Sequence, residues 1–337
     1  MQAWILDGSF GLDHLVLAER PRPRPAPGEV VVRIRAVSLN YRDLVVARGM
    51  YAPDHPLPFV PVSDGAGEVV ELGTGVDRVA VGDRVAGLYA QRWIAGRPTA
   101  VTRASTLGVP RPGVLAEYAI FDAEGTVRVP DHLSYEEAAT LPIAGVTAWH
   151  ALFGTPAPIG AGDTVLVQGT GGVAIFALQL ARLAGARVIV TSKDDTKLAR
   201  ARELGASETI NYRTTPAWDA RARELTDGLG VDLVVDIAGG ELDRSVGAVR
   251  QDGRVALIGF LDGAASRIDL FGVLRNSVRL QGISVGSREM FEELNRALAQ
   301  HRVRPVIDRV FPFARAPEAF AALAAGGHFG KLVIAGV

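Results

Sequence analysis

The feature that most constrains this chain is a glycine-rich turn between a short apolar strand and a long apolar helix. Residues 164–168 form a valine-rich run typical of a buried strand, and residues 169–174, GTGGVA, follow at once. Residues 174–184 are apolar except at Gln179 and Arg182, which indicates a mostly buried helix, and residues 187–191 form a second β-branched run. This order of strand, glycine turn, helix and strand predicts a βαβ unit.

The turn has the spacing of a dinucleotide-binding loop. Gly169 permits a tight turn, Gly171 lacks a Cβ that would block a pyrophosphate, and Ala174 keeps the helix close to the sheet. The helix N-terminus offers unpaired N–H groups and a partial positive charge to phosphates. We therefore predict cofactor contacts from the residues of the turn. These are Gly169, Thr170, Gly171, Gly172 and Val173. The alternative is an ordinary turn without a ligand.

Composition limits the other possibilities. The chain has 337 residues and 48% hydrophobic content, which is enough for two domains with their own cores. Its net charge of −1 gives no electrostatic case for a nucleic-acid or acidic-membrane partner. Cysteine is absent, which excludes disulfides and thiolate metal sites. The sequence shows neither a signal-like segment nor an apolar run of membrane-spanning length, so we expect a soluble cytoplasmic protein acting on a small molecule.

The pattern of expected secondary structure changes along the chain. The first ~120 residues look β-rich, with strands expected at 29–37, 62–72 and 83–88. From about residue 134, helical segments alternate with strands. The later strands are expected at 208–211, 231–236, 254–259 and 279–285. Alternation of this kind predicts an α/β fold with a doubly wound parallel sheet, to which residues 291–337 do not contribute.

Several motifs then resemble one family. They are AVSLNYRDL at 36–44, PFVPVSDGAGEVVELG at 58–73, VGDRV at 81–85, the glycine turn, and GHFGKLVI at 327–334. With these motifs the chain resembles the medium-chain dehydrogenase/reductase superfamily over essentially its full length. The resemblance implies a GroES-like β-rich catalytic domain from both chain ends and a Rossmann domain, with the active site in the cleft between them. The expected ranges are 1–122 and 291–337 for the first and 123–290 for the second.

The family's zinc-binding positions are changed in this sequence. Zinc members bind the catalytic metal with a cysteine, a histidine and a second cysteine, and the matching residues here are Asn40, Ser63 and Ala144. Neutral amides and hydroxyls are poor zinc ligands, and alanine has no donor atom. The region of the family's structural zinc lobe, residues 91–112, has no cysteine. The chain therefore resembles the zinc-independent branch with quinone oxidoreductases and enoyl reductases, and we expect no zinc.

Reduction of an activated alkene or quinone is the chemistry that fits such a site. Without a Lewis acid an alkoxide has little to stabilise it, whereas an oxyanion formed by hydride addition to an enone needs only hydrogen-bond donors. The catalytic candidates are Asn40 as oxyanion donor, Tyr51 as proton donor, and Ser63. The alternatives are a backbone-capping amide for Asn40 and a packed loop aromatic for Tyr51. Asp43 is expected to fix the loop.

The end of the second expected strand indicates the cofactor. An acidic residue there would accept from the ribose of NADH, but this chain has Ser192 and Lys193, which suit the 2′-phosphate of NADPH. Tyr212 follows the next strand and is placed to pack against that phosphate. Asp194 and Asp195 favour NADH if they accept from the ribose, and agree with NADPH if they cap the following helix instead. We therefore predict that the cofactor is NADPH, with NADH as the alternative. The alternative role for Lys193 is that of a solvated surface charge without a ligand. Further cofactor contacts are expected at Thr147, Gly259, Phe260 and Ser284, although Thr147 also suits helix packing.

Other functions stay open at this stage. Residues 282–286, GISVG, match the nucleophile elbow of α/β-hydrolases, with Ser284 as nucleophile and Asp308 and His328 later in the chain. An alcohol dehydrogenase or carbonyl reductase without zinc and a non-catalytic NADPH-binding protein are further alternatives. Two interpretations are open for residues 91–113, which contain Trp93. Either they shape the pocket or an oligomer contact, or they form an exposed loop at the surface. The resemblance also implies a homodimer through the sheet edge at 279–285.

Overall fold

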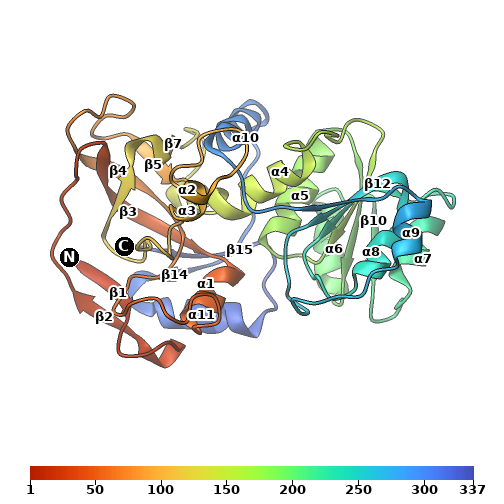
Figure 1. Cartoon of the computed structure of the whole chain (residues 1–337), viewed down its shortest axis with the longest axis horizontal. Coiled ribbons are helices and arrows are strands. Elements are labelled where there is room, and N and C mark those ends of the chain that lie inside the picture. The colour runs from red at the N-terminus through yellow and green to blue at the C-terminus, as the bar shows by residue number, and fades with distance from the viewer. The chain divides into compact units, whose positions relative to one another are not determined.

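The computed structural model describes all 337 residues, which divide into two compact units. The split unit comprises Met1–Val146 and Val285–Val337, and the parallel-sheet unit comprises Thr147–Ser284. Figure 1 shows the elements of each unit by label and colour. None of the helices combines the length and the apolar character needed to cross a membrane.

The unit boundaries differ from the predicted ones after residues 122 and 290. Residues 123–146 pack in the split unit because β7 (Thr126–Arg128) pairs with β5 (Arg84–Gly87) in its sheet. The helical rhythm that begins near residue 134 therefore starts inside the split unit, before the parallel sheet.

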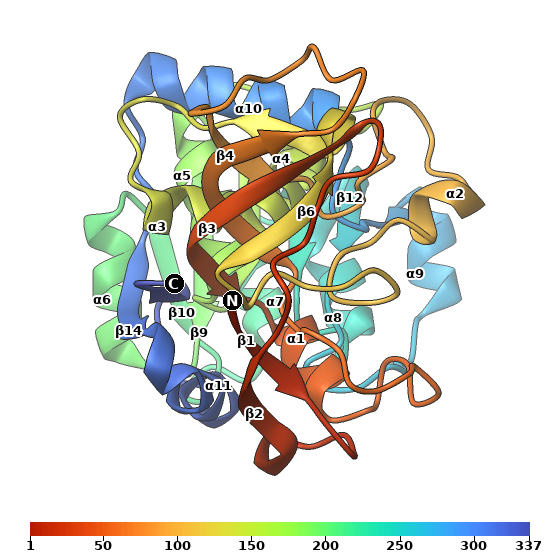
Figure 2. The same cartoon turned by 90° about the vertical axis from the view of Figure 1, so that its left-hand side faces the viewer.

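The split unit is built on a seven-stranded sheet in the order β14-β15-β3-β4-β5-β7, with β6 also paired to β3. Its strands are β3 (Glu29–Leu39), β4 (Asp64–Leu72), β5, β6 (Tyr118–Asp122), β7, β14 (Ile307–Pro312) and β15 (Lys331–Ala335), and β1 (Gln2–Leu6) and β2 (Leu15–Glu19) form a separate ladder. Its helices are α1 (Tyr41–Ala47), α2 (Ala100–Arg103), α3 (Tyr135–Ala139), the π-helix η3 (Leu141–Gly145), α10 (Arg288–His301) and α11 (Ala316–Ala325), with short 3₁₀ turns η1 (Leu12–His14), η2 (Ala123–Gly125) and η4 (Phe313–Arg315). Figure 2 shows β3, β4 and β6 side by side.

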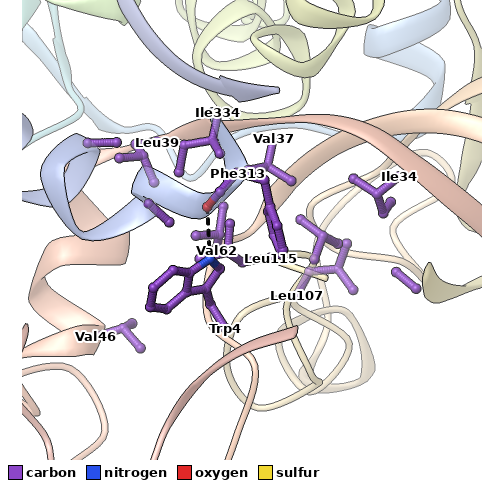
Figure 3. Packing of buried hydrophobic residues seen from close by; sticks show 14 of the residues in the cluster. Trp4, Ile34, Val37, Leu39, Val46, Val62, Leu107, Leu115, Phe313 and Ile334 are labelled. Atoms are coloured by element: carbon purple, nitrogen blue, oxygen red, sulfur yellow. Dashed lines mark hydrogen bonds between the residues drawn. The ribbon is translucent and has the colours of Figure 1, made fainter. Parts of the chain in front are cut away.

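The two ends of the chain meet in this sheet. β15 pairs antiparallel with β3, so that Ile334 lies opposite Val37. In the core, the Trp4 indole N–H donates to the carbonyl of Phe313 at 2.9 Å, and the two rings meet edge to face (Figure 3). The C-terminal residues therefore complete the sheet that the N-terminal strands begin.

Residues 91–113 lie partly in the core of the split unit and partly at its surface, where residues 95–101 are all exposed. Trp93, Leu107 and Val109 are buried, and the Trp93 indole N–H donates to the Gly96 carbonyl at 2.9 Å. Burial of each such side chain stabilises the fold by roughly 1.5–3 kcal/mol.

The parallel-sheet unit holds six parallel strands in the order β10-β9-β8-β11-β12-β13. They are β8 (Thr164–Gln168), β9 (Arg187–Ser192), β10 (Glu208–Asn211), β11 (Val231–Asp236), β12 (Val249–Leu257) and β13 (Arg279–Gly282). The helices are α4 (Val146–Leu152), α5 (Gly172–Leu183), α6 (Asp195–Glu203), α7 (Trp218–Glu224), α8 (Leu242–Ala248) and α9 (Leu270–Arg275).

This arrangement confirms the doubly wound α/β fold predicted from the alternation. Figure 1 shows α5 and α6 on one face of the sheet and α7 and α8 on the other. The strand order reverses between β8 and β11, and sheets of this type bind ligands at such a switch point, beyond the carboxyl ends of the strands.

Candidate active site

The predicted cofactor residues, apart from Thr147, share one position in the fold: each lies in or shortly after the carboxyl end of a parallel strand. Residues 169–173 follow β8, Ser192 and Lys193 end and follow β9, Tyr212 follows β10, Gly259 and Phe260 follow β12, and Ser284 follows β13. Since parallel strands end at the same edge of the sheet, the fold gathers these residues at one edge. Thr147 instead lies buried within α4.

The glycine turn leaves open space in front of α5. Gly169 has a φ of +77°, which an L side chain rarely adopts, so glycine is needed there for the turn itself. Gly171 has extended backbone at the N-cap of α5, and a Cβ added there would meet no atom within 4 Å. The turn therefore fits a pyrophosphate, because the free space lies at the positive end of a 12-residue helix.

The carboxylates after β9 are committed to protein donors. Asp194 caps α6 and accepts from the Lys197 backbone N–H at 3.1 Å, while Asp195 accepts from the Asn211 amide at 2.8 Å. The cap predicted for Asp194 is thus confirmed, and Asp195 is held by β10. Ser192 is buried and Lys193 is exposed, so this strand end presents an ammonium to solvent, with the exposed carboxylate of Asp195 two residues further on.

A buried polar network that the sequence did not reveal fixes the switch point. The Gln168 Oε1 accepts from the backbone N–H groups of Ile237 (3.3 Å) and Ala238 (3.2 Å), and its Nε2 donates to Ser245 Oγ at 2.9 Å. Ser245 Oγ in turn donates to Asp236 Oδ2 at 2.7 Å. The network ties the end of β8 to the loop after β11. The one sign of this network in the sequence is Gln168, a polar residue at the end of the apolar run 164–168.

In the split unit, Asn40 lies between two buried charges. Its Oδ1 accepts from Lys331 Nζ at 2.7 Å, and its Nδ2 donates to Asp64 Oδ2 at 2.9 Å. We call this Lys331–Asn40–Asp64 chain the amide bridge. Asn40 is also the N-cap residue of α1, so the bridge and the capping position considered from the sequence occur together. Its second N–H reaches only the Ser38 carbonyl, at 3.5 Å, where little hydrogen bonding remains.

Burial sets the electrostatics of the amide bridge. Asp64 is fully buried, and desolvation raises its pKa to about 7 against the opposing effects of Lys331 and the Asn40 hydrogen bond. Burial likewise lowers the pKa of Lys331 to about 8, and the negative charges of Asp64 and Asp43 oppose this shift. Asp64 Oδ1 has no hydrogen-bond partner. Lys331 was not predicted as a site residue, although a lysine opening the apolar run 331–334 is an unusual feature of the sequence.

Asp43 and Ser63 join α1 to the start of β4. The Asp43 carboxylate accepts from the Asn40 backbone N–H at 2.8 Å, from the Ser63 N–H at 3.1 Å and from Ser63 Oγ at 2.8 Å. Asp43 thus fixes the loop, as expected. Ser63 is fully buried and also accepts from the Arg42 guanidinium, so its hydroxyl is held inside the protein. This geometry speaks against the catalytic role considered for Ser63.

Tyr51 lies at the surface against Arg42. Its side chain is 50% exposed, and the Arg42 guanidinium carbon lies 5.1 Å from the centre of its ring and 4.9 Å from that of Tyr89. Tyr89 shares a side-chain hydrogen bond with Tyr51, and burial raises the pKa of Tyr89 to about 12. Tyr51 is therefore an accessible phenol, in contrast to Tyr89. Arg42 and Tyr89 were not identified from the sequence.

The residues at the family's zinc positions do not fit the metal. Asn40 is held in the amide bridge, Ser63 is bonded to Asp43 and Arg42, and Ala144 in η3 has no donor atom. No three histidine, cysteine, aspartate or glutamate side chains of the structure are grouped so that they could hold a metal ion.

The nucleophile elbow considered as an alternative at 282–286 does not form. Ser284 lies two residues beyond β13, and α10 begins only at Arg288, after its own N-cap Ser287. The positive φ of this segment falls on Val285, whereas an elbow places the serine itself on the strained turn into the helix. The hydrolase alternative is wrong for this segment.

Comparison with known proteins covers both units. Residues 26–131 match the family described as alcohol dehydrogenase GroES-like domain, and residues 172–300 match the family described as zinc-binding dehydrogenase. A zinc-type alcohol dehydrogenase-like protein of Schizosaccharomyces pombe is 41% identical over 91% of this chain and 90% of its own length. The crystal structure of an NAD-dependent alcohol dehydrogenase has a TM-score of 0.88 and 33% identity over 99% of each chain. Structures of a mycobacterial quinone oxidoreductase and of a mycobacterial complex with NADPH each have a TM-score of 0.83 and 29% identity, over 99% of both chains.

Proposed function

This chain belongs to the medium-chain dehydrogenase/reductase superfamily and is an NAD(P)-dependent oxidoreductase, and on that premise we propose that it is a zinc-independent, NADPH-dependent reductase of enones, enals or quinones. The amide bridge carries the proposal. At the position of the family's first zinc ligand, this chain has an amide bonded to an ammonium and a carboxylate. An amide can donate a hydrogen bond, but it is a poor ligand for zinc.

The chemistry of alkene reduction matches what these residues offer. Bound NADPH supplies a hydride, which goes to the carbon β to the carbonyl of the acceptor. Negative charge then collects on the carbonyl oxygen, and the weakly engaged N–H of Asn40 stabilises it. The Tyr51 phenol, which is half exposed, donates the proton that completes the reduction. The loop that bears Tyr51 is held by Arg42 and Tyr89.

The preference for NADPH rests on the end of β9. One relative is named as NAD-dependent and another is complexed with NADPH, so the relatives alone support either cofactor. In this chain Asp194 and Asp195 are bonded to protein donors, and Lys193 places an exposed ammonium directly after buried Ser192. An ammonium attracts a 2′-phosphate, and Tyr212, which is 40% exposed, offers a ring to pack against it.

A substrate comparison tests the proposed activity. The metal-free protein is assayed for NADPH oxidation with a cyclic enone and with benzoquinone, and for NADP⁺ reduction with a panel of primary and secondary alcohols. The proposal expects turnover of the enone or quinone at least tenfold faster than of any alcohol. The names of the alcohol dehydrogenase relatives favour a second candidate, alcohol oxidation without zinc, and faster turnover of alcohols would replace the proposal with it.

We also propose a homodimer through the free edge of β13. β13 is the last strand of its sheet, with Leu280 36% exposed, and α9 exposes three apolar side chains. They are Leu270 (67%), Phe271 (70%) and Leu274 (76%). An unpaired strand edge and an exposed apolar helix face each suit an isologous contact with a second copy. Light scattering after gel filtration should give twice the chain mass for the wild type and a smaller value for Leu274→Glu. A monomeric wild type at micromolar concentration would refute this part.

A further inference from the structure

Lys331 and Asp64 have no direct part in the proposed reaction, yet both are buried beside Asn40. We infer that they are positioning residues, which lock the Asn40 side chain in one orientation and so present one of its N–H groups to the acceptor oxygen. The inference rests on the proposed function only for what Asn40 binds. The lock itself follows from the hydrogen bonds.

The polarity of the two partners decides the orientation of the amide. An ammonium only donates hydrogen bonds, so Lys331 Nζ, 2.7 Å away, requires the oxygen of the amide. The Asp64 carboxylate, when ionised, only accepts them, so Oδ2, 2.9 Å away, requires the nitrogen. A flipped amide would face donor with donor and acceptor with acceptor. The Lys331 ammonium therefore fixes the orientation of Asn40, and the bond to Asp64 is charge-assisted as well when that carboxyl is ionised.

Segments far apart in the sequence hold the two partners in place. Lys331 Nζ also donates to the Leu39 carbonyl at 2.7 Å, and the pairing of Leu332 with Leu39 brings β15 alongside β3. Asp64 opens β4 opposite Ser38 on β3, and its Oδ2 accepts from the Ile143 N–H at 3.2 Å. Both partners are thus anchored to the backbone on either side of Asn40.

The lock also strengthens the donor. An ammonium bonded to the oxygen of an amide draws electrons from its nitrogen and makes the N–H groups more acidic. One N–H of Asn40 is taken by Asp64. The other, whose only protein acceptor is the Ser38 carbonyl at 3.5 Å, is free to bond a substrate oxygen. Asn40 therefore supplies one polarised, oriented donor.

The chain's composition permits a direct test of the lock by NMR. The sequence contains four asparagines, at positions 40, 211, 276 and 295, so asparagine-selective ¹⁵N labelling gives four side-chain NH₂ signals, and Asn40→Asp assigns the one of interest. In Lys331→Met and in the isosteric Asp64→Asn, whose new amide adds a fifth signal, the Asn40 signal should shift and exchange faster with solvent. Lys331→Arg keeps a cationic donor and should retain most of the wild-type shift. Lys197→Met, which removes a lysine of α6, serves as the matched control.

Kinetics then test the consequence for the reaction. Lys331→Met should lower kcat and kcat/KM for the enone together by about tenfold or more, with Lys331→Arg recovering part of the loss, because the donor acts on the transition state. If Asn40 signals in both Lys331→Met and Asp64→Asn coincide with the wild type, the lock does not exist. If they shift while kcat is unchanged, the positioning role is refuted. A wild-type protein that reduces no enone or quinone defeats the proposed function, and the NMR result still decides the lock.

Discussion

Replacing Asp64 with asparagine should change how the stability of this protein depends on pH. Burial raises the pKa of the Asp64 carboxyl from 3.8 to about 7. Between these values the folded protein holds a proton that the unfolded chain has released, so protons favour the folded state and its stability falls as pH rises through this window. Asp64→Asn removes this group, and the variant should therefore gain stability relative to the wild type as pH increases.

The size of the effect follows from the shift. Within the window, one pH unit corresponds to about 1.4 kcal/mol, so the stability of the variant relative to the wild type should rise by about 2 to 3 kcal/mol from pH 5 to pH 7. Asp64 is fully buried, so solvent does not screen its charge.

Urea unfolding of both proteins at half-unit pH steps, followed by tryptophan fluorescence, measures this difference. Asp83→Asn is the matched control. A backbone hydrogen bond from Ala80 and pairing with Arg128 lower the pKa of Asp83, so its contribution is lost only at lower pH and this variant should differ from the wild type by a constant amount. Parallel stability curves for Asp64→Asn and the wild type between pH 5 and pH 7 would refute the burial argument.

Three further predictions concern the cofactor and the proton donor. Gly171→Ala should leave the free energy of unfolding within about 0.5 kcal/mol of the wild type, since the added Cβ meets no atom, but it should weaken NADPH binding in a fluorescence titration. Gly169→Ala, at a position with φ +77°, should instead lower the free energy of unfolding by about 1–2 kcal/mol in chemical denaturation. Lys193→Ala should weaken NADPH binding by about tenfold at low salt and leave NADH binding unchanged, as expected for an exposed ammonium facing a phosphate. Equal losses of affinity for both cofactors would count against this role. Tyr51→Phe should lower kcat for enone reduction by about tenfold or more in a steady-state assay without changing the melting temperature, because the ring is half exposed; an unchanged kcat would assign the proton to water or to another group.

The fold could be predicted from the sequence where local pattern and packing agree. The strands at 164–168, 208–211 and 231–236 have the bounds expected, because runs rich in β-branched residues that end at polar or glycine residues leave little choice of limits. The first unit boundary could not be predicted in the same way. The segment 134–152 reads as one helical stretch, but its first part packs in the split unit, and only tertiary contacts reveal the division.

The candidate site was predictable only in part. The family resemblance pointed to Asn40 and Tyr51, and the glycine spacing to the cofactor turn. The partners of Asn40 are 24 and 291 positions away along the chain, and no local pattern connects such distant residues. For the same reason the sequence did not show that Ser63 is bonded to Asp43 and Arg42, or that Tyr89 lies beside Tyr51.

Hydride transfer without zinc is the central claim, and single-turnover reduction of a cyclic enone by NADPH tests it most directly. The reaction is followed with protein treated with a chelator and with untreated protein, while bound zinc is measured by mass spectrometry. We predict equal rates for the two preparations and far less than one zinc per chain. A rate that is lost with the chelator and returns as one zinc per chain is restored would contradict the account.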